Sequence, residues 1–224
     1  MQTDSLLYAA TVSCLSDQGL YASACAAVSP ERRERCACLA SEEARFRSLG
    51  AAVLLQQALR DFGCSDCRTA VGSHGKPFLK NGPFFNLSHS GDWVLCAVSP
   101  FEVGCDIEQI KPFYPSFARR FFTQEEYADI LAQPSPAEQA VRFFRYWTLK
   151  ESFLKATGLG LSLPLNAFRI VLGKNVSVLQ DADPRTFFFA EYEDLPGCAC
   201  SLCTAASPAR PPLRRWDLAE LLSR

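Results

Sequence analysis

Two stretches decide what this chain can fold into and do: Val103-Gly104-Cys105-Asp106-Ile107-Glu108 and Trp147-Thr148-Leu149-Lys150-Glu151-Ser152-Phe153-Leu154-Lys155. The first alternates apolar and polar residues, which is typical of a β-strand. Side chains two positions apart share one face of a strand, so Asp106 and Glu108 should point the same way. The second has a helical pattern that places Glu151 and Lys155 one turn apart on one face. Three carboxylates and an ammonium on two rigid elements can bind a hard cation and act on its ligand, such as a magnesium-bound phosphate or pyrophosphate.

Each of these pairs also has an ordinary interpretation. Asp106 and Glu108 could be solvent-facing acids on an edge strand, although like charges on one face repel unless a cation lies between them. Glu151 and Lys155 could form a helix salt pair, which contributes only about 0.3–0.5 kcal/mol. On a helical wheel, however, Glu151 falls close to Phe144, at the rim of the apolar stripe, and this position indicates a cleft.

Size and composition set the broad class of protein. The 224 residues suffice for one large domain or two small ones, and 48% hydrophobic residues allow a substantial core. The formal net charge of −1 gives no basic field for nucleic acid. No apolar run reaches the roughly 18 residues of a membrane span, and residues 1–8 lack the pattern of a signal peptide. We therefore expect a cytoplasmic protein that binds neither nucleic acid nor membranes.

The chain contains 11 cysteines. Most occupy positions suited to small hydrophobic residues, such as Cys96 and Cys105, so we expect reduced thiols rather than a disulfide framework. Two groups resemble zinc-ligand spacing: Cys64-x2-Cys67 and Cys198-x-Cys200-x2-Cys203. The second alternates like a strand, and structural zinc sites usually show two clean ligand pairs, so we do not expect zinc.

The first half of the sequence predicts helices followed by strands. Ser29-Pro30-Glu31 indicates the start of a short helix, and Ser41 and Gly63 bound a longer helix that reaches about Phe62. Residues 72–82 predict a loop. Strands are expected at 84–87 and 93–98, joined by residues 88–92, and a third strand at 103–108.

The second half repeats this order. Thr123 should begin a helix through Leu131, and a proline-marked break at 133–136 precedes a long helix over about 137–157 that Gly158 and Gly160 stop. Strands are expected near 167–172, 176–180, 186–193 and 198–205, then an extended tail at 210–212 and a short helix at 216–222. Because helix-then-strands occurs twice, we predict an α+β fold of two similar halves, residues 1–103 and 104–224.

Further polar residues precede the first stretch. His89 lies within Asn86-Leu87-Ser88-His89-Ser90-Gly91, but there is no Gly-x-Ser-x-Gly elbow for acyl transfer, so His89 is structural or contacts an anion. Lys76, in a Gly-Lys-Pro turn, is either a solvated lysine or a phosphate ligand. The residues Arg32, Arg35, Arg47 and Ser48 form either a solvated helix face or a phosphomonoester site, since guanidinium groups match phosphate oxygens.

Five motifs follow one another along the chain: Gly75-Lys76-Pro77, Phe85-Asn86-Leu87-Ser88-His89-Ser90, Gly104-Cys105-Asp106-Ile107-Glu108, Phe121-Phe122-Thr123-x-x-Glu126-Tyr127, and Trp147-x-x-Lys150-Glu151-Ser152-Phe153-x-Lys155-x-x-Gly158-x-Gly160-Leu161. In this order they resemble the surfactin-type (group II) 4′-phosphopantetheinyl transferases, over roughly residues 28 to 168. Any one motif is weakly diagnostic, whereas five in sequence are specific. The sequence has arginine at 32 and 35, where this family often has lysine, and Ser48 where threonine is common.

The resemblance implies a monomeric pseudodimer of two α+β halves with coenzyme A in the cleft between them. The implied reaction transfers 4′-phosphopantetheine from coenzyme A to a serine of an apo acyl carrier protein or peptidyl carrier domain and releases 3′,5′-ADP. The first half would bind the adenosine end and its 3′-phosphate, and the second would supply the metal site, the catalytic helix and the C-terminal tail.

The resemblance also implies residue roles. Mg2+, or Mn2+ in its place, would bind to Asp106, Glu108 and Glu151. Glu151, with Glu126 through a water molecule, would help to deprotonate the carrier serine, and Lys155 would neutralise the pyrophosphate. The residues implied to bind coenzyme A are Arg32, Arg35, Arg47, Ser48, Lys76, Ser88, His89, Lys150 and Lys155.

The segment from Lys111 to Phe122 combines aromatic residues with Arg119 and Arg120. It is either a linker packed on the core or a docking surface for the acidic helices of a carrier protein. Two other functions stay open: a coenzyme A-binding module without catalysis and a thiol-rich interaction protein. The complete set of carboxylates with Lys155 argues against the first, and the ordered motifs argue against the second.

Overall fold

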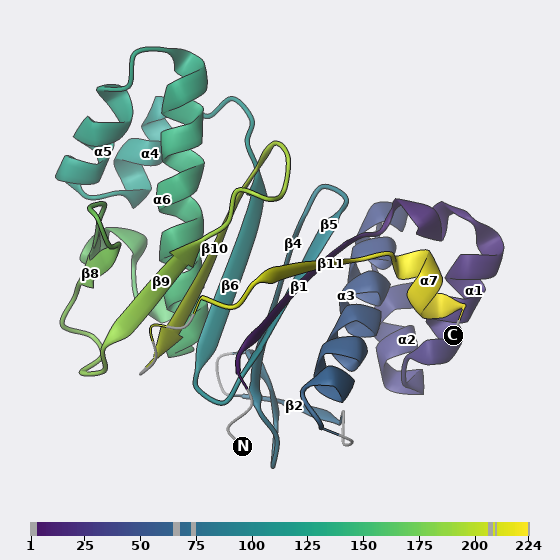
Figure 1. The fold of residues 1–224 in the computed structure, drawn as a ribbon. Coiled ribbons are helices and arrows are strands. Elements are labelled where there is room, and N and C mark those ends of the chain that lie inside the picture. Colours follow the sequence, from purple (N-terminus) through teal and green to yellow (C-terminus); the bar gives the residue numbers. More distant parts are fainter. Residues whose placement is uncertain (1–3, 65–67, 73–74, 206–207, 209, 224) are drawn as a thin grey trace.

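The computed structural model describes residues 4–64, 68–72, 75–205, 208 and 210–223. Two sheets lie next to each other in the middle of the molecule, and each is covered by a long helix on its outer side (Figure 1). Among the described residues, no helix is both long enough and apolar enough to span a bilayer.

The first half contains these elements: β1 (Leu6–Thr11), the 3₁₀ helix η1 (Ser13–Ser16), α1 (Gln18–Ala27), α2 (Pro30–Ala37), α3 (Glu42–Asp61), β2 (Thr69–Val71), β3 (Pro77–Leu79), β4 (Phe84–Ser90) and β5 (Trp93–Ser99). The predicted N-caps are confirmed, because the Ser29 and Ser41 hydroxyls accept hydrogen bonds from the backbone N–H groups of Arg32 and Ala44. The predicted loop at 72–82 is wrong in part, since β3 pairs there with β2.

The second half contains these elements: β6 (Val103–Gln109), α4 (Pro115–Phe121), α5 (Gln124–Leu131), α6 (Pro136–Thr157), the 3₁₀ helices η2 (Gly160–Ser162) and η3 (Leu165–Ala167), β7 (Arg169–Val171), β8 (Ser177–Leu179), β9 (Phe187–Glu191), β10 (Cys198–Ala205), β11 (Leu213–Trp216) and α7 (Leu218–Leu222). Thr123 and Glu126 form a capping box at α5. Gly158 ends α6 in the left-handed conformation, with φ of 75°.

The two halves have the same strand order. In the first sheet the order is β11-β1-β5-β4, and in the second it is β6-β10-β9. If β11 is left out, the first sheet has the order β1-β5-β4 and the second has the order β6-β10-β9. In each sheet the strand that comes last in the sequence lies in the middle, between the first strand and the second-to-last strand. Each half also has a long helix, α3 or α6, followed by a small hairpin, β2–β3 or β7–β8. The predicted pseudodimer of two similar α+β halves is confirmed.

The tail of the chain returns to the first half. Strand β11 pairs in parallel with β1, from Leu7 opposite Leu213 to Ala10 opposite Trp216, and α7 packs near α1 and α3. The expected helix at 216–222 is shorter, because Trp216 belongs to β11. Sequence patterns did not reveal β1, α1, α4 or β11.

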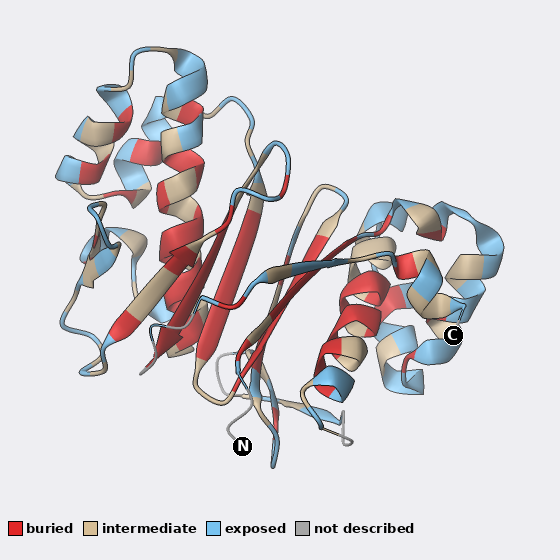
Figure 2. Cartoon of the chain, in the orientation of Figure 1, coloured by how far each residue is buried: buried red, intermediate tan, exposed pale blue. Residues whose placement is uncertain are grey.

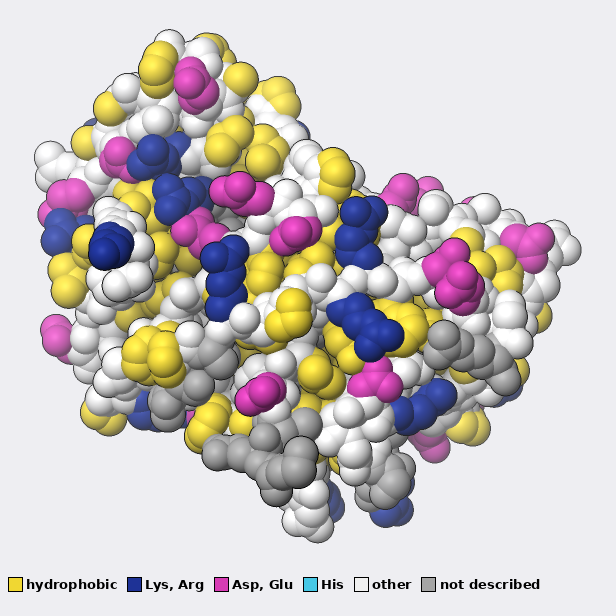
Figure 3. Space-filling model, in the orientation of Figure 1, with side chains coloured by type: hydrophobic (Ala, Val, Ile, Leu, Met, Phe, Trp, Pro, Cys, Tyr) yellow, Lys and Arg dark blue, Asp and Glu magenta, His cyan; other side chains and the backbone are white. Residues whose placement is uncertain are grey.

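Three apolar clusters follow one another across the molecule (Figure 2). The first lies between α3 and the first sheet, the third between the two sheets, and the second between the second sheet and α6. Strand β1 contributes side chains to two of these clusters, because successive side chains of a strand point to opposite faces. Tyr8 and Ala10 face α3, whereas Leu7 and Ala9 face the other sheet. The face in Figure 3 mixes acidic and basic side chains without a large area of one sign.

Candidate active site

Gly104 allows strand β6 to lie directly against helix α6. A Cβ atom at this position would be 2.1 Å from the carbonyl oxygen of Ser152 and 2.4 Å from the backbone nitrogen of Ala156. Backbone atoms in a packed helix cannot move aside, so only glycine fits. The close approach brings the carboxylates of β6 next to Glu151 and Lys155 of α6, as the two sequence stretches predict.

Asp106 and Lys155 form the centre of this group. The Lys155 Nζ atom donates to Asp106 Oδ1 at 2.6 Å, to the Ser88 hydroxyl at 3.1 Å and to the Cys105 carbonyl at 3.2 Å. Partial burial lowers the pKa of Lys155, but the Asp106 carboxylate outweighs it and leaves that pKa raised. Lys155 therefore stays a cation at neutral pH.

Glu108 and Glu151 face the same region. A pocket of about 300 Å³ is lined by Leu87, Ser88, His89, Asp106, Glu108, Trp147, Glu151 and Lys155. Burial raises the pKa of Glu151, and the negative charges of Asp106 and Glu108 raise it further. Burial and the Asp106 charge also raise the pKa of Glu108. The three carboxylates thus share one electrostatic environment.

These carboxylates fit a hard cation. Asp106 is 3% exposed, and its Oδ2 atom is buried with no hydrogen-bond partner among the described residues. An unpaired buried carboxylate oxygen is costly, and a divalent cation bound by oxygen ligands would satisfy it. In the described ranges, no three His, Cys, Asp or Glu side chains lie close enough together to form a preformed metal site.

Side chains of β4 connect the two sheets at this point. Asn86 Oδ1, Ser88 Oγ and Ser90 Oγ accept hydrogen bonds from the backbone N–H groups of Cys105, Ile107 and Gln109, at 2.9, 3.4 and 3.0 Å. The Ser88 and Ser90 hydroxyls also donate to Asp106 and Glu108, at 2.8 and 2.7 Å. We call Asn86, Ser88 and Ser90, together with the β6 backbone N–H groups and the two carboxylates that they contact, the polar seam.

The polar seam corrects one expectation and adds two residues. The sequence predicted that β4 ends at Leu87 and that residues 88–92 form a turn, but β4 continues to Ser90. The correction explains the contacts, because alternate residues of a strand share one face. Asn86 and Ser90 were not expected at the site. Asn86, Ser88 and Ser90 occupy alternate positions, as Asp106 and Glu108 do, and this alternation is the signal that could have identified them.

His89 lines the same pocket as the carboxylates. Desolvation, together with the positive charges of Arg47 and Lys155, lowers the pKa of His89. Arg47 reaches the turn after β4, where its Nη1 atom donates to the Gly91 carbonyl at 3.4 Å. Ser88 and His89 are consecutive residues of β4, and no hydrogen bond joins their side chains in the described chain, so they do not form a serine–histidine nucleophile pair.

Lys76 lies in an adjoining pocket, which it shares with Pro77, Asn86, Glu151, Leu154, Lys155, Gly158 and Gly160. Its Nζ atom donates to the carbonyls of Val103, Lys155 and Ala156, at 3.2, 2.5 and 3.4 Å. Two of these carbonyls belong to the last turn of α6, where a cation is favourable. Burial lowers the pKa of Lys76 to about 8.

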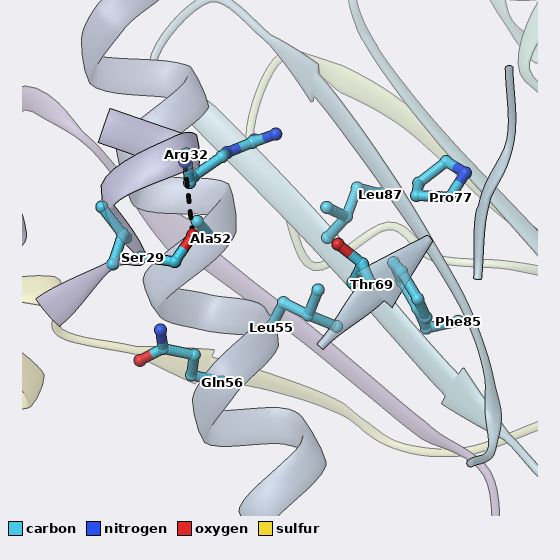
Figure 4. Close-up of a pocket in the computed structure, with 10 residues that line it drawn as sticks. Ser29, Arg32, Ala52, Leu55, Gln56, Thr69, Pro77, Phe85 and Leu87 are labelled. Carbon is cyan, nitrogen blue, oxygen red and sulfur yellow. Dashed lines mark hydrogen bonds between the residues drawn. The ribbon is translucent and has the colours of Figure 1, made fainter. Parts of the chain in front are cut away.

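A third pocket begins at Arg32. Figure 4 shows Ser29, Arg32 and Gln56 on one side of it and Leu87, Pro77 and Phe85 on the other. Arg32 Nη2 donates to the Ser48 carbonyl at 3.1 Å, while Arg32 Nε is buried without a hydrogen-bond partner in the part of the chain that is described. The structure thus brings Arg32 and Ser48 together. Arg35 is exposed and does not line this pocket.

Glu126 and Lys150 form a separate buried pair. Lys150 Nζ is 2.9 Å from Glu126 Oε2 and donates to the carbonyls of Leu165 and Phe168. Glu126 also accepts from the backbone N–H groups of Thr123 and Ile170. Neither residue lines the pocket of the three carboxylates. Their contacts instead tie α5, α6 and β7 together.

The segment Lys111–Phe122 contains helix α4, which the sequence did not predict. Phe113 stacks on Phe143, with ring centroids 4.7 Å apart, and Phe117 and Phe121 contact Trp147 of α6. Tyr114 is 79% exposed and Phe117 42% exposed. One side of the segment is therefore packed on the core and the other faces outward, next to the pocket that Trp147 lines.

The cysteines of β10 show no disulfide in the described part of the chain. Cys198, Cys200 and Cys203 are free thiols there. Burial raises the pKa of Cys200 and Cys203 well above the ordinary value, so both remain neutral thiols. The candidate partner of Cys64, Cys67, lies outside the described residues.

Comparisons with known proteins identify the family of the chain. Residues 102–203 match the model of the 4′-phosphopantetheinyl transferase superfamily. The chain is 37% identical over 185 residues to 4′-phosphopantetheinyl transferase Sfp of Bacillus subtilis, which covers 80% of this chain and 82% of that protein. It is 47% identical over 104 residues to 4′-phosphopantetheinyl transferase psf-1 of Bacillus pumilus, covering 46% and 44% of the two chains. The chain therefore belongs to the 4′-phosphopantetheinyl transferase family of enzymes.

Proposed function

We propose that the protein transfers the 4′-phosphopantetheine moiety of coenzyme A to a serine hydroxyl of an apo acyl carrier protein or peptidyl carrier domain, with Mg2+, and releases 3′,5′-ADP. The observation that carries this proposal is the convergence of Asp106, Glu108, Glu151 and Lys155 on one pocket where the two halves meet. The family assignment supplies the reaction class.

The three pockets suit an elongated ligand such as coenzyme A. The carboxylate pocket and the Lys76 pocket share Glu151 and Lys155, and the Arg32 pocket shares Pro77 with one and Leu87 with the other. The pockets therefore adjoin. In this proposal the first half binds the adenosine end and its 3′-phosphate, with Arg32, Ser48, Lys76, Ser88 and His89, while the second half holds the pyrophosphate.

Arg32 and Lys76 differ in how ready they are for a phosphate. Arg32 Nε is a buried donor without a partner in the described residues, so an anion would relieve it. The three contacts of Lys76 Nζ are all to backbone carbonyls, and it would exchange some of them for a phosphate oxygen. Arg47 and the exposed Arg35 would contribute longer-range positive charge.

Asp106, Glu108 and Glu151 would hold the metal ion. When bound, Mg2+ would neutralise charge on the pyrophosphate oxygens and orient them. The unpaired Oδ2 atom of Asp106 supports this assignment. Lys155, a cation beside Asp106, would stabilise the negative charge that develops on the departing 3′,5′-ADP.

Glu151 would also accept a proton from the carrier serine. Its raised pKa makes it a better proton acceptor than an ordinary glutamate. As the serine oxygen bonds to the β-phosphorus, the bond from that phosphorus to the bridging oxygen breaks, and this oxygen leaves with 3′,5′-ADP. The protein supplies no covalent nucleophile of its own, and positioning with charge stabilisation suffices for such a reaction.

We assign the carrier protein to the exposed side of α4. Tyr114 and Phe117 offer an apolar surface, and the exposed Arg119 and Arg120 add positive charge for an acidic partner. Phe117 and Phe121 connect this surface to Trp147 at the edge of the pocket. Glu126 and Lys150 would support α6 from within rather than contact the ligand.

Intact-mass spectrometry tests the proposal. An apo acyl carrier protein and an apo peptidyl carrier domain are each incubated with the protein, coenzyme A and Mg2+, and a parallel sample contains EDTA. We expect each accepted carrier to gain the mass of one phosphopantetheine arm, and EDTA to prevent the gain. If coenzyme A binds but neither carrier gains mass, the protein either acts on a narrower set of partners or is a coenzyme A-binding module without catalysis.

A further inference from the structure

Ser90 occupies an unusual position in the polar seam. Its Oγ atom accepts a hydrogen bond from the Gln109 backbone at 3.0 Å and donates to Glu108 Oε2 at 2.7 Å. A hydroxyl has one proton, and with a lone pair directed at the Gln109 N–H group that proton points to Glu108. The carboxylate of Glu108 is thus held by a group that is itself fixed on the backbone of the same strand.

The neighbourhood keeps Ser90 in place. Ser90 pairs with Trp93 at the end of the β4–β5 hairpin. At the following residue, Gly91, a Cβ atom would lie 2.1 Å from the side-chain nitrogen of Gln109, so the turn closes tightly on β6. Arg47 donates to the Gly91 carbonyl and connects this turn to α3. A serine held on several sides can fix the orientation of the carboxylate that it contacts.

Asn86 shows that joining the sheets does not require this second contact. Its Oδ1 atom accepts from the Cys105 backbone at 2.9 Å, with the same offset of 19 residues that relates Ser90 to Gln109. Within the described chain Asn86 contacts no carboxylate, because the β6 residue that corresponds to Asp106 and Glu108, with the same offset of 18 from β4, is Gly104. The seam therefore contains one member that only joins the sheets and two serines that also hold acids.

We infer that Ser90 is a positioning residue for the metal site: its hydroxyl holds Glu108 in the orientation in which it binds the divalent cation. The inference rests on the proposed function, because that proposal makes Glu108 a metal ligand. Hydrogen bonds from neighbouring groups orient ligating carboxylates, and losing one typically weakens metal affinity about 10–100-fold. Ser88 holds Asp106 in the same way but also contacts Lys155.

Threonine and valine at position 90 provide a matched pair. They have nearly the same shape and both suit a strand, but only threonine has a hydroxyl. Binding of Mn2+ to the full chain without coenzyme A is measured by the loss of the free-Mn2+ electron paramagnetic resonance signal. We expect Ser90→Thr to bind within about 2-fold of the wild type and Ser90→Val to bind about 10-fold more weakly.

Two further variants separate the possible outcomes. Ser5→Ala removes a buried hydrogen bond to the Ser99 hydroxyl, and neither residue lines one of the three pockets, so this variant should lower the midpoint of thermal unfolding but leave the Mn2+ affinity unchanged. Asp106→Ala should abolish Mn2+ binding. If it does, but Ser90→Val and Ser90→Thr bind Mn2+ equally, the inference about Ser90 is wrong and the proposed function stands. If wild type and Asp106→Ala bind Mn2+ alike, the metal site of the proposed function fails, and the inference fails with it.

Discussion

The Nζ atom of Lys155 lies 2.6 Å from Oδ1 of Asp106, so a cation of helix α6 is held against a carboxylate of strand β6. The carboxylate is almost fully buried, whereas the lysine side chain is 27% exposed to the pocket. Lys155 therefore compensates one oxygen of Asp106, and the other oxygen is left for a second positive group. In the proposed function, this arrangement would let one site bind both a metal ion and an anionic substrate.

Replacing Asp106 with alanine should lower kcat/KM for transfer at least about 100-fold, the typical effect of losing one group that stabilises charge in a transition state. The loss should be accompanied by a weaker dependence on Mg2+. Steady-state rates over a Mg2+ series check both effects. Asp92→Ala, in the exposed turn after β4, is the matched control and should leave the rates unchanged. Full activity of Asp106→Ala without added metal would show that the three-carboxylate site is wrongly assigned.

The lowered pKa of Lys76 predicts that the free energy of unfolding depends on pH. Burial lowers its pKa in the folded protein to about 8, whereas an unfolded lysine has a pKa of about 10.4. Between these values the unfolded chain binds more protons, so this group makes the free energy of unfolding rise with pH, by about 3 kcal/mol at most.

Urea unfolding of wild type and Lys76→Met between pH 7 and pH 11 checks this prediction. The nearby thiols of Cys105 and Cys203 and the guanidinium of Arg185 are present in both proteins, so the difference between the two curves isolates Lys76. We expect the stability of the wild type relative to Lys76→Met to increase from about pH 8 upward. A constant or falling difference would mean that Lys76 is not desolvated in the folded protein.

The pair of Glu126 and Lys150 should matter for stability. Breaking a buried ion pair by removing one charge typically costs about 3–5 kcal/mol, so Glu126→Gln should lower the free energy of unfolding by roughly that amount. The neighbouring Glu125 forms an exposed pair with Arg169, and Glu125→Gln should cost less than about 1 kcal/mol. Urea unfolding measures both.

The same variants test whether Glu126 takes part in the reaction. At a temperature where Glu126→Gln is fully folded, we expect its transfer rate to stay within about 3-fold of the wild type, because Glu126 does not line the carboxylate pocket. A loss of 100-fold or more, with an intact fold, would instead assign Glu126 to the catalytic group.

Gly104 should tolerate no side chain. Gly104→Ala forces a methyl group against the backbone of α6, and overpacking of this kind costs about 1–3 kcal/mol or more. Gly173→Ala is the control, because its nearest contact would be 3.5 Å away and its φ is not in the left-handed region. Thermal unfolding should show a lower midpoint for Gly104→Ala and little change for Gly173→Ala; equal midpoints would contradict the close packing of β6 on α6.

Local sequence patterns predicted most helices and strands near the site. The caps at Ser29, Ser41 and Thr123 and the stop at Gly158 are decided by nearby residues, so they are visible in the sequence. The face shared by Asp106 and Glu108 follows from the period of a strand. Strand β11 was missed because its pairing with β1 joins the two ends of the chain, and no local pattern reports such a contact.

The same reasoning explains which site residues could not be placed. Lys150 and Glu151 are adjacent in sequence, but the helix turns one into a buried pair with Glu126 and the other into the pocket. Ser90 looked like a turn residue because serine and glycine are typical of turns. Its contacts with Gln109 and Glu108 depend on how the two sheets meet, which is decided by packing between halves.

The most direct test of the central claim is phosphopantetheine transfer by Glu151→Gln, measured by intact-mass spectrometry of an apo carrier protein with coenzyme A and Mg2+. Glutamine keeps the shape of Glu151 but can neither accept the serine proton nor provide a charged metal ligand. With a thermal unfolding midpoint like that of the wild type, we expect no phosphopantetheine gain under conditions where the wild type converts the carrier completely. Near-normal conversion by the variant would contradict the role of Glu151 and of the three-carboxylate site.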